Sequence, residues 1–179
     1  PVVVDLPKDI QLSNCEYINR QDRHGRRYKP IINPEKNKII EVAKLLVNAK
    51  KPIIYGGGGI INSGPEASKL LRELVDLVEI PTTLTLMGLG ALPYDNKYFL
   101  GMLGMHGTYE ANLSMYNCDV MLNIGARFDD RITGNLKEFS PYSKKIHIDI
   151  DPSSINKSVP VDIPIISDAS IAIKELISE

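Results

Sequence analysis

Cysteine is scarce in this sequence, and the two that occur, Cys15 and Cys118, show no C-x-x-C spacing. The three histidines are not clustered either. A zinc site needs cysteine or histidine ligands at short spacings, and a disulfide framework needs a set of paired cysteines. We therefore expect no metal site in this chain and a reducing compartment, which is the cytoplasm, or an organelle if the source is eukaryotic.

Long apolar runs and an excess of one charge are also missing. No run reaches the roughly 18 residues of a membrane span, and no basic-then-apolar signal segment opens the chain. The 21 lysines and arginines against 22 aspartates and glutamates leave a formal net charge of -1. Such a balance provides no broad field that would attract nucleic acid. These absences predict a soluble protein that binds neither nucleic acid nor a membrane, and they favour small-molecule chemistry.

The apolar content that is present suits one domain. Of the 179 residues, 43% are hydrophobic and 24% charged, as in a globular domain with a sizeable core. The chain opens without methionine on an apolar run around residues 2–4, which predicts a strand, and a polar stretch at residues 13–27 follows. We expect a piece cut from a longer protein, with residues 1–33 as the end of a preceding domain and a linker, and residues 34–179 as the domain.

From residue 34 the pattern alternates between helices and short strands. The spacing of apolar residues predicts helices at residues 34–49, 65–78, 108–117 and 169–177, and strands at 52–55, 81–86, 119–124, 145–151 and 161–166. Apolar strands that alternate with helices indicate an α/β fold, a parallel sheet covered on both faces. In such sheets ligands bind at the carboxyl ends of the strands, where this sequence has glycine, arginine and aspartate.

Four consecutive glycines, residues 56–59, follow the first expected strand. Glycine lets the backbone approach a ligand closely, and the N-terminus of a following helix favours phosphate. However, the run is neither a G-x-G-x-x-G fingerprint nor a P-loop, and Thr85-Leu86-Met87 stands where an NAD-binding domain would have an acidic residue. A nucleotide site and a tight structural turn both remain open, and ordinary NAD binding is disfavoured.

A charged cluster at residues 125–131 (GARFDDR) follows the third expected strand. Burying such charges is costly unless they are used, and arginine forks suit phosphate and carboxylate. Arg127 is suited to a pyrophosphate and Arg131 to a substrate acid; the alternative is an exposed loop whose charges pair with one another. Further on, Asp149 or Asp151 could hold a ribose, unless Asp151 only caps a helix before Pro152.

Histidine and methionine contribute two weaker candidates. His106 lies in the glycine loop at residues 101–107, where its ring can pack on a planar cofactor or be exposed. Its neighbour Met105 is the methionine best placed to line a substrate cavity. Neither His24 nor His147 has a serine or cysteine partner pattern, so we predict no catalytic triad and assign no catalytic residue in this chain.

Four strings resemble the catalytic large subunits of the acetolactate synthase (acetohydroxyacid synthase) family. They are VVVDLPKD at residues 2–9, TLMGLG at 85–90, MLGMHG at 102–107 and GARFDDRITG at 125–134. The likeness covers nearly the whole chain and concerns the central domain of that thiamine diphosphate enzyme. It implies a three-layer sandwich with a parallel sheet, a Rossmann-like (DHS-like) domain that binds FAD.

The activity implied by the resemblance is the condensation of pyruvate with a second 2-oxo acid, pyruvate or 2-oxobutyrate, with release of CO2, in branched-chain amino-acid biosynthesis. FAD does no net redox work there. Thiamine diphosphate and Mg²⁺ bind through motifs outside this chain, so the fragment alone is expected to be inactive. The implied partners are the 2-oxo acids, further catalytic subunits in a homodimer or tetramer, and a small regulatory subunit.

The resemblance also assigns site residues. It places Arg131 and Met105 against the substrate. It assigns FAD to Arg26 (with Arg27 as the alternative), Gly57, Gly58, Gly59, Thr85, Leu86, Met87, Leu103, Gly104, Met105, His106, Gly125, Arg127, Asp129, Arg131 and Ile132, and the adenosine end to Asp149, Ile150, Ser167 and Asp168. Two positions depart from the family pattern, because Gly56 replaces a usual valine and Ser167 a usual glycine.

Two other interpretations remain. One is the central domain of another FAD-containing thiamine enzyme, such as glyoxylate carboligase or pyruvate oxidase, against which the arginine-rich and methionine-histidine strings argue. The other is a non-catalytic nucleotide-binding module that resembles an electron-transfer flavoprotein domain. Carboligation by the full-length protein would distinguish these interpretations.

Overall fold

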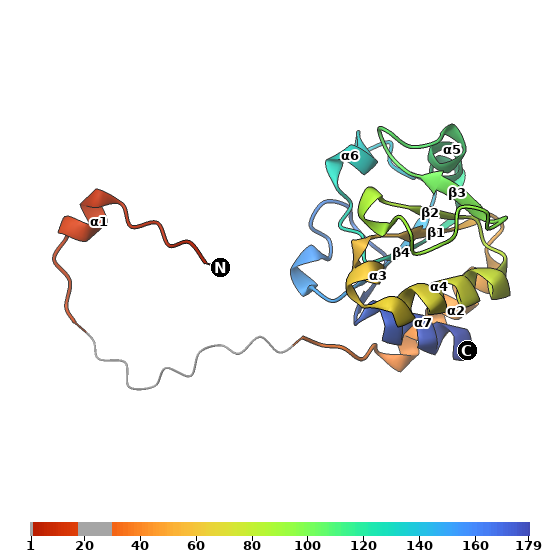
Figure 1. Cartoon of the computed structure of the whole chain (residues 1–179), viewed down its shortest axis with the longest axis horizontal. Helices are drawn as coiled ribbons and strands as arrows, with labels where there is room; N and C mark the ends of the chain where they lie inside the picture. The colour runs from red at the N-terminus through yellow and green to blue at the C-terminus, as the bar shows by residue number, and fades with distance from the viewer. Residues whose placement is uncertain (1, 18–29) are drawn as a thin grey trace.

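The structure is a computed structural model that describes residues 2–17 and 30–179. Its centre is a six-stranded sheet in the order β3-β2-β1-β4-β5-β6, and every neighbouring pair of strands is parallel (Figure 1). The strands are β1 (Pro52–Gly56), β2 (Thr82–Leu84), β3 (Phe99–Met102), β4 (Val120–Ile124), β5 (Lys144–Asp149) and β6 (Ile163–Ile166). The prediction of a parallel α/β fold is confirmed.

Helices cover both faces of the sheet and make three layers. Figure 1 shows α2 (Lys36–Asn48), α4 (Pro65–Val78) and α7 (Ala169–Ser178) together on one face, and α5 (Tyr109–Asn117) on the other. The buried residues of α4 include Ala67, Leu71, Leu74 and Val75, which is the spacing of one helical face. That face packs in a core cluster with sheet residues such as Ile54 and Leu122.

The opposite face of the sheet holds a smaller core. Met115 of α5 packs there with Ile53, Tyr55 and Met121 of the central strands, and Phe128 closes the cluster. Successive strand residues point to opposite faces, so the uninterrupted apolar sequence of β4 supplies both cores at once. All five residues of β4 are buried, as expected for a central strand.

One strand was missed by the sequence analysis, which took residues 101–107 as a glycine loop. Gly101 and Met102 instead end β3, the edge strand, which pairs with β2 through an irregular register. All four residues of β3 are only partly buried, and an edge strand containing glycine has neither the apolar run nor the alternation that predicts a strand.

Four short helical turns at the carboxyl ends of the strands were not predicted either. They are α3 (Gly58–Asn62), η1 (Leu86–Gly88), α6 (Asp130–Thr133) and η2 (Pro152–Ser154). One or two turns are too short to show helical periodicity in the sequence. They matter because each follows a strand at the edge where a ligand would bind.

The strand predicted around residues 2–4 is wrong. Residues 2–17 are all exposed and contain one short helix, α1 (Lys8–Leu12), and no strand. A strand requires a partner backbone for its hydrogen bonds, and no described residue supplies one. The predicted linker lies partly, and His24, Arg26 and Arg27 lie wholly, outside the described residues.

No helix in residues 2–17 and 30–179 is long and apolar enough to cross a membrane. The same residues contain no group of three or more histidine, cysteine, aspartate or glutamate side chains that could hold a metal ion.

Candidate functional site

A cavity of about 610 Å³ opens at the carboxyl ends of the strands. It lies where the strand order reverses, between β1 and β4, which is where open parallel sheets bind their ligands. Its volume falls within the range of small-molecule and cofactor sites. The lining residues are Tyr55, Gly58, Gly59, Ile61, Asn62, Ser63, Thr85, Leu86, Met87, Gly125, Ala126, Arg127, Asp129, Arg131, Ile132, Ile148, Asp149, Ile150, Asp151, Ser154, Ser167, Asp168 and Ala169.

The glycine run after β1 has two roles. A Cβ atom on Gly57 would lie 2.2 Å from the Gly125 carbonyl oxygen, and one on Gly59 would lie 2.6 Å from the Gly125 Cα. These two glycines therefore let the loop after β1 pack against the loop after β4, which is the structural alternative noted above. Gly58 differs, because its nearest neighbour would be the Met87 Cβ at 3.0 Å and it lines the cavity.

Both arginines of the 125–131 cluster lie at the cavity rim. The Arg127 side chain is 78% exposed and 3.8 Å from Asp129, and the Arg131 side chain is 72% exposed and 3.5 Å from Asp130. The alternative interpretation, an exposed loop whose charges pair with one another, therefore describes this segment. Exposed pairs of this kind are weak, so both guanidinium groups stay available to an anion.

Asp129 shapes this rim through the backbone. Its carboxylate accepts a hydrogen bond from the Arg131 N–H at 3.1 Å and caps α6. The Arg131 backbone hydrogen bond, followed by the Asp130 side chain and the two arginine charges, holds the pKa of Asp129 below its usual value. Asp129 is therefore ionised near neutral pH and fixes the turn that carries Arg131.

The two aspartates after β5 have different roles. Asp151 accepts hydrogen bonds from the Ser153 N–H and Oγ, both at 2.9 Å, and caps η2. This is the capping alternative, and the hydrogen bonds lower the pKa of Asp151. Both aspartates line the cavity, but both Asp151 oxygens accept from Ser153, whereas Asp149 accepts the Asp151 N–H at 2.8 Å through Oδ1 alone among the described residues. Asp149 therefore has an oxygen left for a ligand and is the better placed of the two.

Asp168 also lines the cavity and connects Ser63, at the end of α3, with the start of α7. Its Oδ1 accepts hydrogen bonds from the Ser63 Oγ at 2.6 Å and from the Ser170 N–H at 2.9 Å, and it caps α7. Burial alone would raise the pKa of Asp168, but the hydrogen bonds from Ser170 and Ser63 lower it below the usual value. The cavity lining therefore includes the ionised Asp168 carboxylate, which hydrogen bonds hold in place.

Ser167, the residue before Asp168, forms a hydrogen bond with the segment that precedes α2. The side chain is fully buried, and its Oγ donates a hydrogen bond to the Ile32 carbonyl at 2.7 Å. The Asp168 N–H donates to the same carbonyl at 3.1 Å. Ser167, where the resemblance leads one to expect glycine, thus provides a hydrogen bond that glycine could not.

We expect the Ser167→Ala variant to lose about 0.5–1.5 kcal/mol of unfolding free energy, the usual contribution of one hydrogen bond. Urea unfolding measures the loss. The matched control is Ser178→Ala, because the Ser178 hydroxyl bonds to the Glu175 carbonyl in an exposed position and should matter little. Equal losses in the two variants would contradict the role of the Ile32 contact.

Several assigned residues lie outside the cavity lining. They are Gly57, Leu103, Gly104, Met105 and His106, while Arg26 is not described. The 101–107 segment nevertheless packs beside Arg131, because the Met105 N–H donates to the Arg131 carbonyl at 2.9 Å. Met105 itself is 66% exposed. The two residues assigned to substrate are therefore neighbours. Arg131 lines the cavity, whereas Met105 lies outside the lining.

Tyr55 is a cavity residue that the sequence analysis missed. Its side chain is fully buried, and its hydroxyl has no hydrogen-bond partner among the described residues. Burial, assisted by the charge of Asp129, raises the pKa of the Tyr55 phenol, so the group remains a hydroxyl donor. In the sequence this tyrosine ends an ordinary apolar strand run, and nothing there marked it as different from a core residue.

The sheet order and the cavity at its reversal define a Rossmann-like α/β domain. The chain belongs to the family described as thiamine pyrophosphate enzyme, central domain, which it matches over residues 39–176. The family assignment and the Rossmann-like, three-layer prediction agree with the observed architecture.

Curated relatives sharpen the family assignment. The chain is 48% identical to the acetolactate synthase large subunits of Buchnera aphidicola subsp. Schizaphis graminum and of Haemophilus influenzae, over 99% of this chain and 31% of each relative. It is 46% identical to the acetolactate synthase isozyme 3 large subunit of Escherichia coli, with the same coverage. The chain thus spans about a third of the length of these relatives.

Proposed function

We propose that this chain is the FAD-binding central domain of an acetolactate synthase large subunit. The whole protein would condense pyruvate with a second 2-oxo acid, pyruvate or 2-oxobutyrate, and release CO2 in branched-chain amino-acid biosynthesis. Thiamine diphosphate and Mg²⁺ would bind outside this chain, so catalysis belongs to the whole protein. The observation that carries the proposal is a cavity at the β1/β4 reversal lined by two of the strings that resemble this family.

The chemistry of the cavity fits FAD. Two exposed guanidinium groups, of Arg127 and Arg131, stand at the rim, where a pyrophosphate could accept their hydrogen bonds. Leu86, Met87 and Ile132 add apolar surface to the lining, which suits a planar ring. The buried Tyr55 hydroxyl has no hydrogen-bond partner among the described residues. Such unpaired groups are rare in native proteins unless a water molecule or a ligand accepts the hydrogen bond.

The carboxylates fit the remainder of the molecule. Asp149 and Asp168 line the cavity and accept hydrogen bonds, so they suit the hydroxyls of a ribose or ribitol. Bound FAD would supply a planar flavin beside the reacting groups and, by resemblance, no net redox step. In this proposal the chain's own residues bind and orient that cofactor and present Arg131 toward the second oxo acid.

The partners of the whole protein are part of the proposal. The relatives are named large subunits, and the name implies a small subunit beside them. We propose the same arrangement here, with a small regulatory subunit and two or four catalytic chains in the cytoplasm. The relatives' names also favour acetolactate synthase over other FAD-containing thiamine enzymes and over a non-catalytic nucleotide module.

The test of FAD binding uses Gly58, which lines the cavity. We expect Gly58→Val in the whole protein to weaken FAD binding roughly tenfold or more, because the added methyl groups enter the cavity and overpacking costs about 1–3 kcal/mol. Bound flavin per chain, measured by absorbance after gel filtration, reports the change. Because any new Cβ would lie 3.0 Å from the Met87 Cβ, the melting temperature is measured in parallel, so that loss of flavin is distinguished from unfolding.

The Gly58→Ala variant is the matched control, because it adds the Cβ alone and should retain most of the FAD. Unchanged flavin stoichiometry in Gly58→Val would sink the assignment. Acetolactate production by the whole wild-type protein tests the activity itself, and a flavoprotein that forms no acetolactate from pyruvate would refute that part of the proposal.

A further inference from the structure

Three polar side chains form a row across the sheet beneath the cavity. In the strand register Tyr55 of β1 pairs with Asn123 of β4, which pairs with His147 of β5. Residues paired across neighbouring strands point to the same face of a sheet. All three side chains are fully buried, in a part of the core that is otherwise apolar. Burial of a polar group is costly without a partner, so each member of the row needs an explanation.

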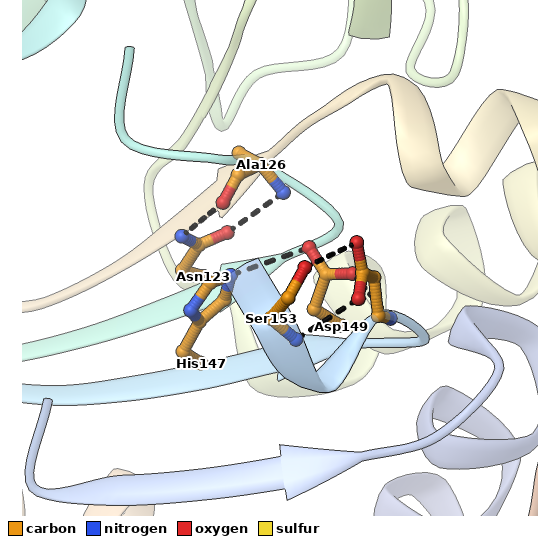
Figure 2. Close-up of polar contacts among 6 residues, drawn as sticks. Asn123, Ala126, His147, Asp149 and Ser153 are labelled. Atoms are coloured by element: carbon orange, nitrogen blue, oxygen red, sulfur yellow. Dashed lines mark hydrogen bonds and ion pairs between the residues drawn. The ribbon is translucent and has the colours of Figure 1, made fainter. Parts of the chain in front are cut away.

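Asn123 is explained by the turn that follows its own strand. Its Nδ2 donates to the Ala126 carbonyl at 2.8 Å, and its Oδ1 accepts the Ala126 N–H at 3.1 Å. Figure 2 shows both bonds closing on the loop after β4. The asparagine therefore has its partners within the fold and holds the segment that leads to Arg127.

His147 is not explained in this way. Both ring nitrogens are buried and have no hydrogen-bond partner among the described residues. The Asp149 carboxylate lies close to the ring, with its Oδ2 3.5 Å from Nε2 (Figure 2). This separation is beyond the usual 2.7–3.2 Å of an N–H···O hydrogen bond, so the two groups face each other without a close contact.

Packing determines where the ring can point. Phe128 meets His147 edge to face, with ring centroids 5.1 Å apart and planes at 75°. Phe128 is itself held against Tyr55 and Phe139. The ring of His147 cannot turn freely in such a cluster, and the alternation of β5 puts Asp149 on the same side of the strand.

Asp149 provides the connection to the cavity. Its Oδ1 already accepts the Asp151 N–H at 2.8 Å, which leaves Oδ2 as the oxygen nearest His147. The Asp149 side chain is only 11% exposed but lines the cavity. A ligand that reaches the Asp149 carboxylate would therefore contact a group that has His147 on its other side, and His147 affects how that carboxylate is oriented.

We propose that His147 is a positioning residue that holds the Asp149 carboxylate toward a hydroxyl-bearing part of the bound ligand. A bare, acceptor nitrogen that faced a carboxylate would be repelled, so Nε2, the nitrogen 3.5 Å from Oδ2, carries a hydrogen. This N–H donates to Oδ2 once a ligand hydroxyl draws the carboxylate into place. The inference rests on the proposed FAD binding, with the hydroxyls of the nucleotide as the groups that Asp149 receives.

The experiment measures FAD affinity by flavin fluorescence in the whole protein after removal of its cofactor. His147→Phe keeps a planar ring but loses the donor, and we expect FAD to bind roughly tenfold more weakly, the effect of one hydrogen bond to a charged group. His147→Gln keeps an N–H donor and should recover most of the affinity. His147→Phe combined with Asp149→Asn should bind no more weakly than Asp149→Asn alone, because His147 acts through Asp149.

A purely structural role for His147 would behave differently. Thr82→Val is the control for lost core stability, since the buried Thr82 hydroxyl donates to the Ile80 carbonyl and Thr82 does not line the cavity. It should lower the melting temperature without changing FAD affinity. A loss of affinity that is equally large with aspartate or asparagine at position 149 would overturn the inference, as would unchanged affinity in His147→Phe.

Nitrogen-15 NMR of labelled histidine provides an independent readout. The His147 signals, assigned by their absence in His147→Phe or His147→Gln, should show a hydrogen on Nε2. A hydrogen on Nδ1 with a bare Nε2 would overturn the inference. If the wild-type protein binds no FAD, the proposed function fails separately, and the tautomer still decides whether His147 faces Asp149 as a donor.

Discussion

The Gly125→Ala variant should lose about 2–5 kcal/mol of unfolding free energy, a large part of the total for an ordinary domain. Gly125 has φ 64°, and a Cβ atom there would lie 2.6 Å from the Gly59 Cα. A left-handed conformation costs an alanine about 1–2 kcal/mol, and overpacking typically adds about 1–3 kcal/mol. Neither strain is easily relieved, because the Gly125 N–H is bonded to the Ile148 carbonyl at 2.8 Å. Urea unfolding gives the value.

The matched control separates backbone strain from the steric clash. Gly90 also has a positive φ, 95°, but a Cβ there would meet nothing within 4 Å. Gly90→Ala should therefore show the cost of a positive φ without the clash, and its loss should be clearly smaller. Equal losses at both positions would mean that the contact between the loops after β1 and β4 contributes nothing measurable.

The second large effect is expected at Arg131. We predict that Arg131→Lys in the whole protein lowers affinity for the second 2-oxo acid by about 1–3 kcal/mol, the range for a charged hydrogen bond, because lysine keeps the charge but loses the planar fork. The structure favours this residue, since its backbone is held on both sides while the side chain is 72% exposed at the rim. Pyruvate decarboxylation should be less affected.

Apparent affinity for the second oxo acid is the measurement, with bound FAD quantified in parallel. Arg127→Lys is the matched control, because its side chain is similarly exposed and paired with Asp129, yet it is assigned to the pyrophosphate and should change FAD binding instead. Oxo-acid affinity that is unchanged in Arg131→Lys with full FAD would defeat the prediction.

The elements that could be predicted are those with a local signature. The predicted helix at residues 65–78 coincides with α4 (Pro65–Val78), because its apolar face repeats over several turns between a proline start and a polar end. The apolar runs of β1 and β4 were likewise visible. The turns α3 and α6 were missed because four or five residues cannot show a helical period, and the edge strand β3 was missed because its four residues include a glycine and form no apolar run.

The candidate site was predicted unevenly for the same reason. Glycine, arginine and aspartate at strand ends indicated the edge of the sheet, and the cavity lies there. Tyr55 and His147 gave no signal, since each stands in an apolar strand where a buried tyrosine or histidine is ordinary. Their importance follows from the tertiary structure, which leaves their buried polar atoms without a hydrogen-bond partner among the described residues.

By itself the sequence determined the α/β class, the succession of most helices and strands, the likeness to a thiamine enzyme family and the residue types at the strand ends. All of these depend on spacing and composition within short stretches of chain. Only the tertiary structure decided that β4 lies beside β1, which places Gly125 on Gly59, opens the cavity between their loops, and sets Tyr55, Asn123 and His147 in one row. Strand order depends on contacts between residues far apart in the chain, and no local pattern records which strands will meet.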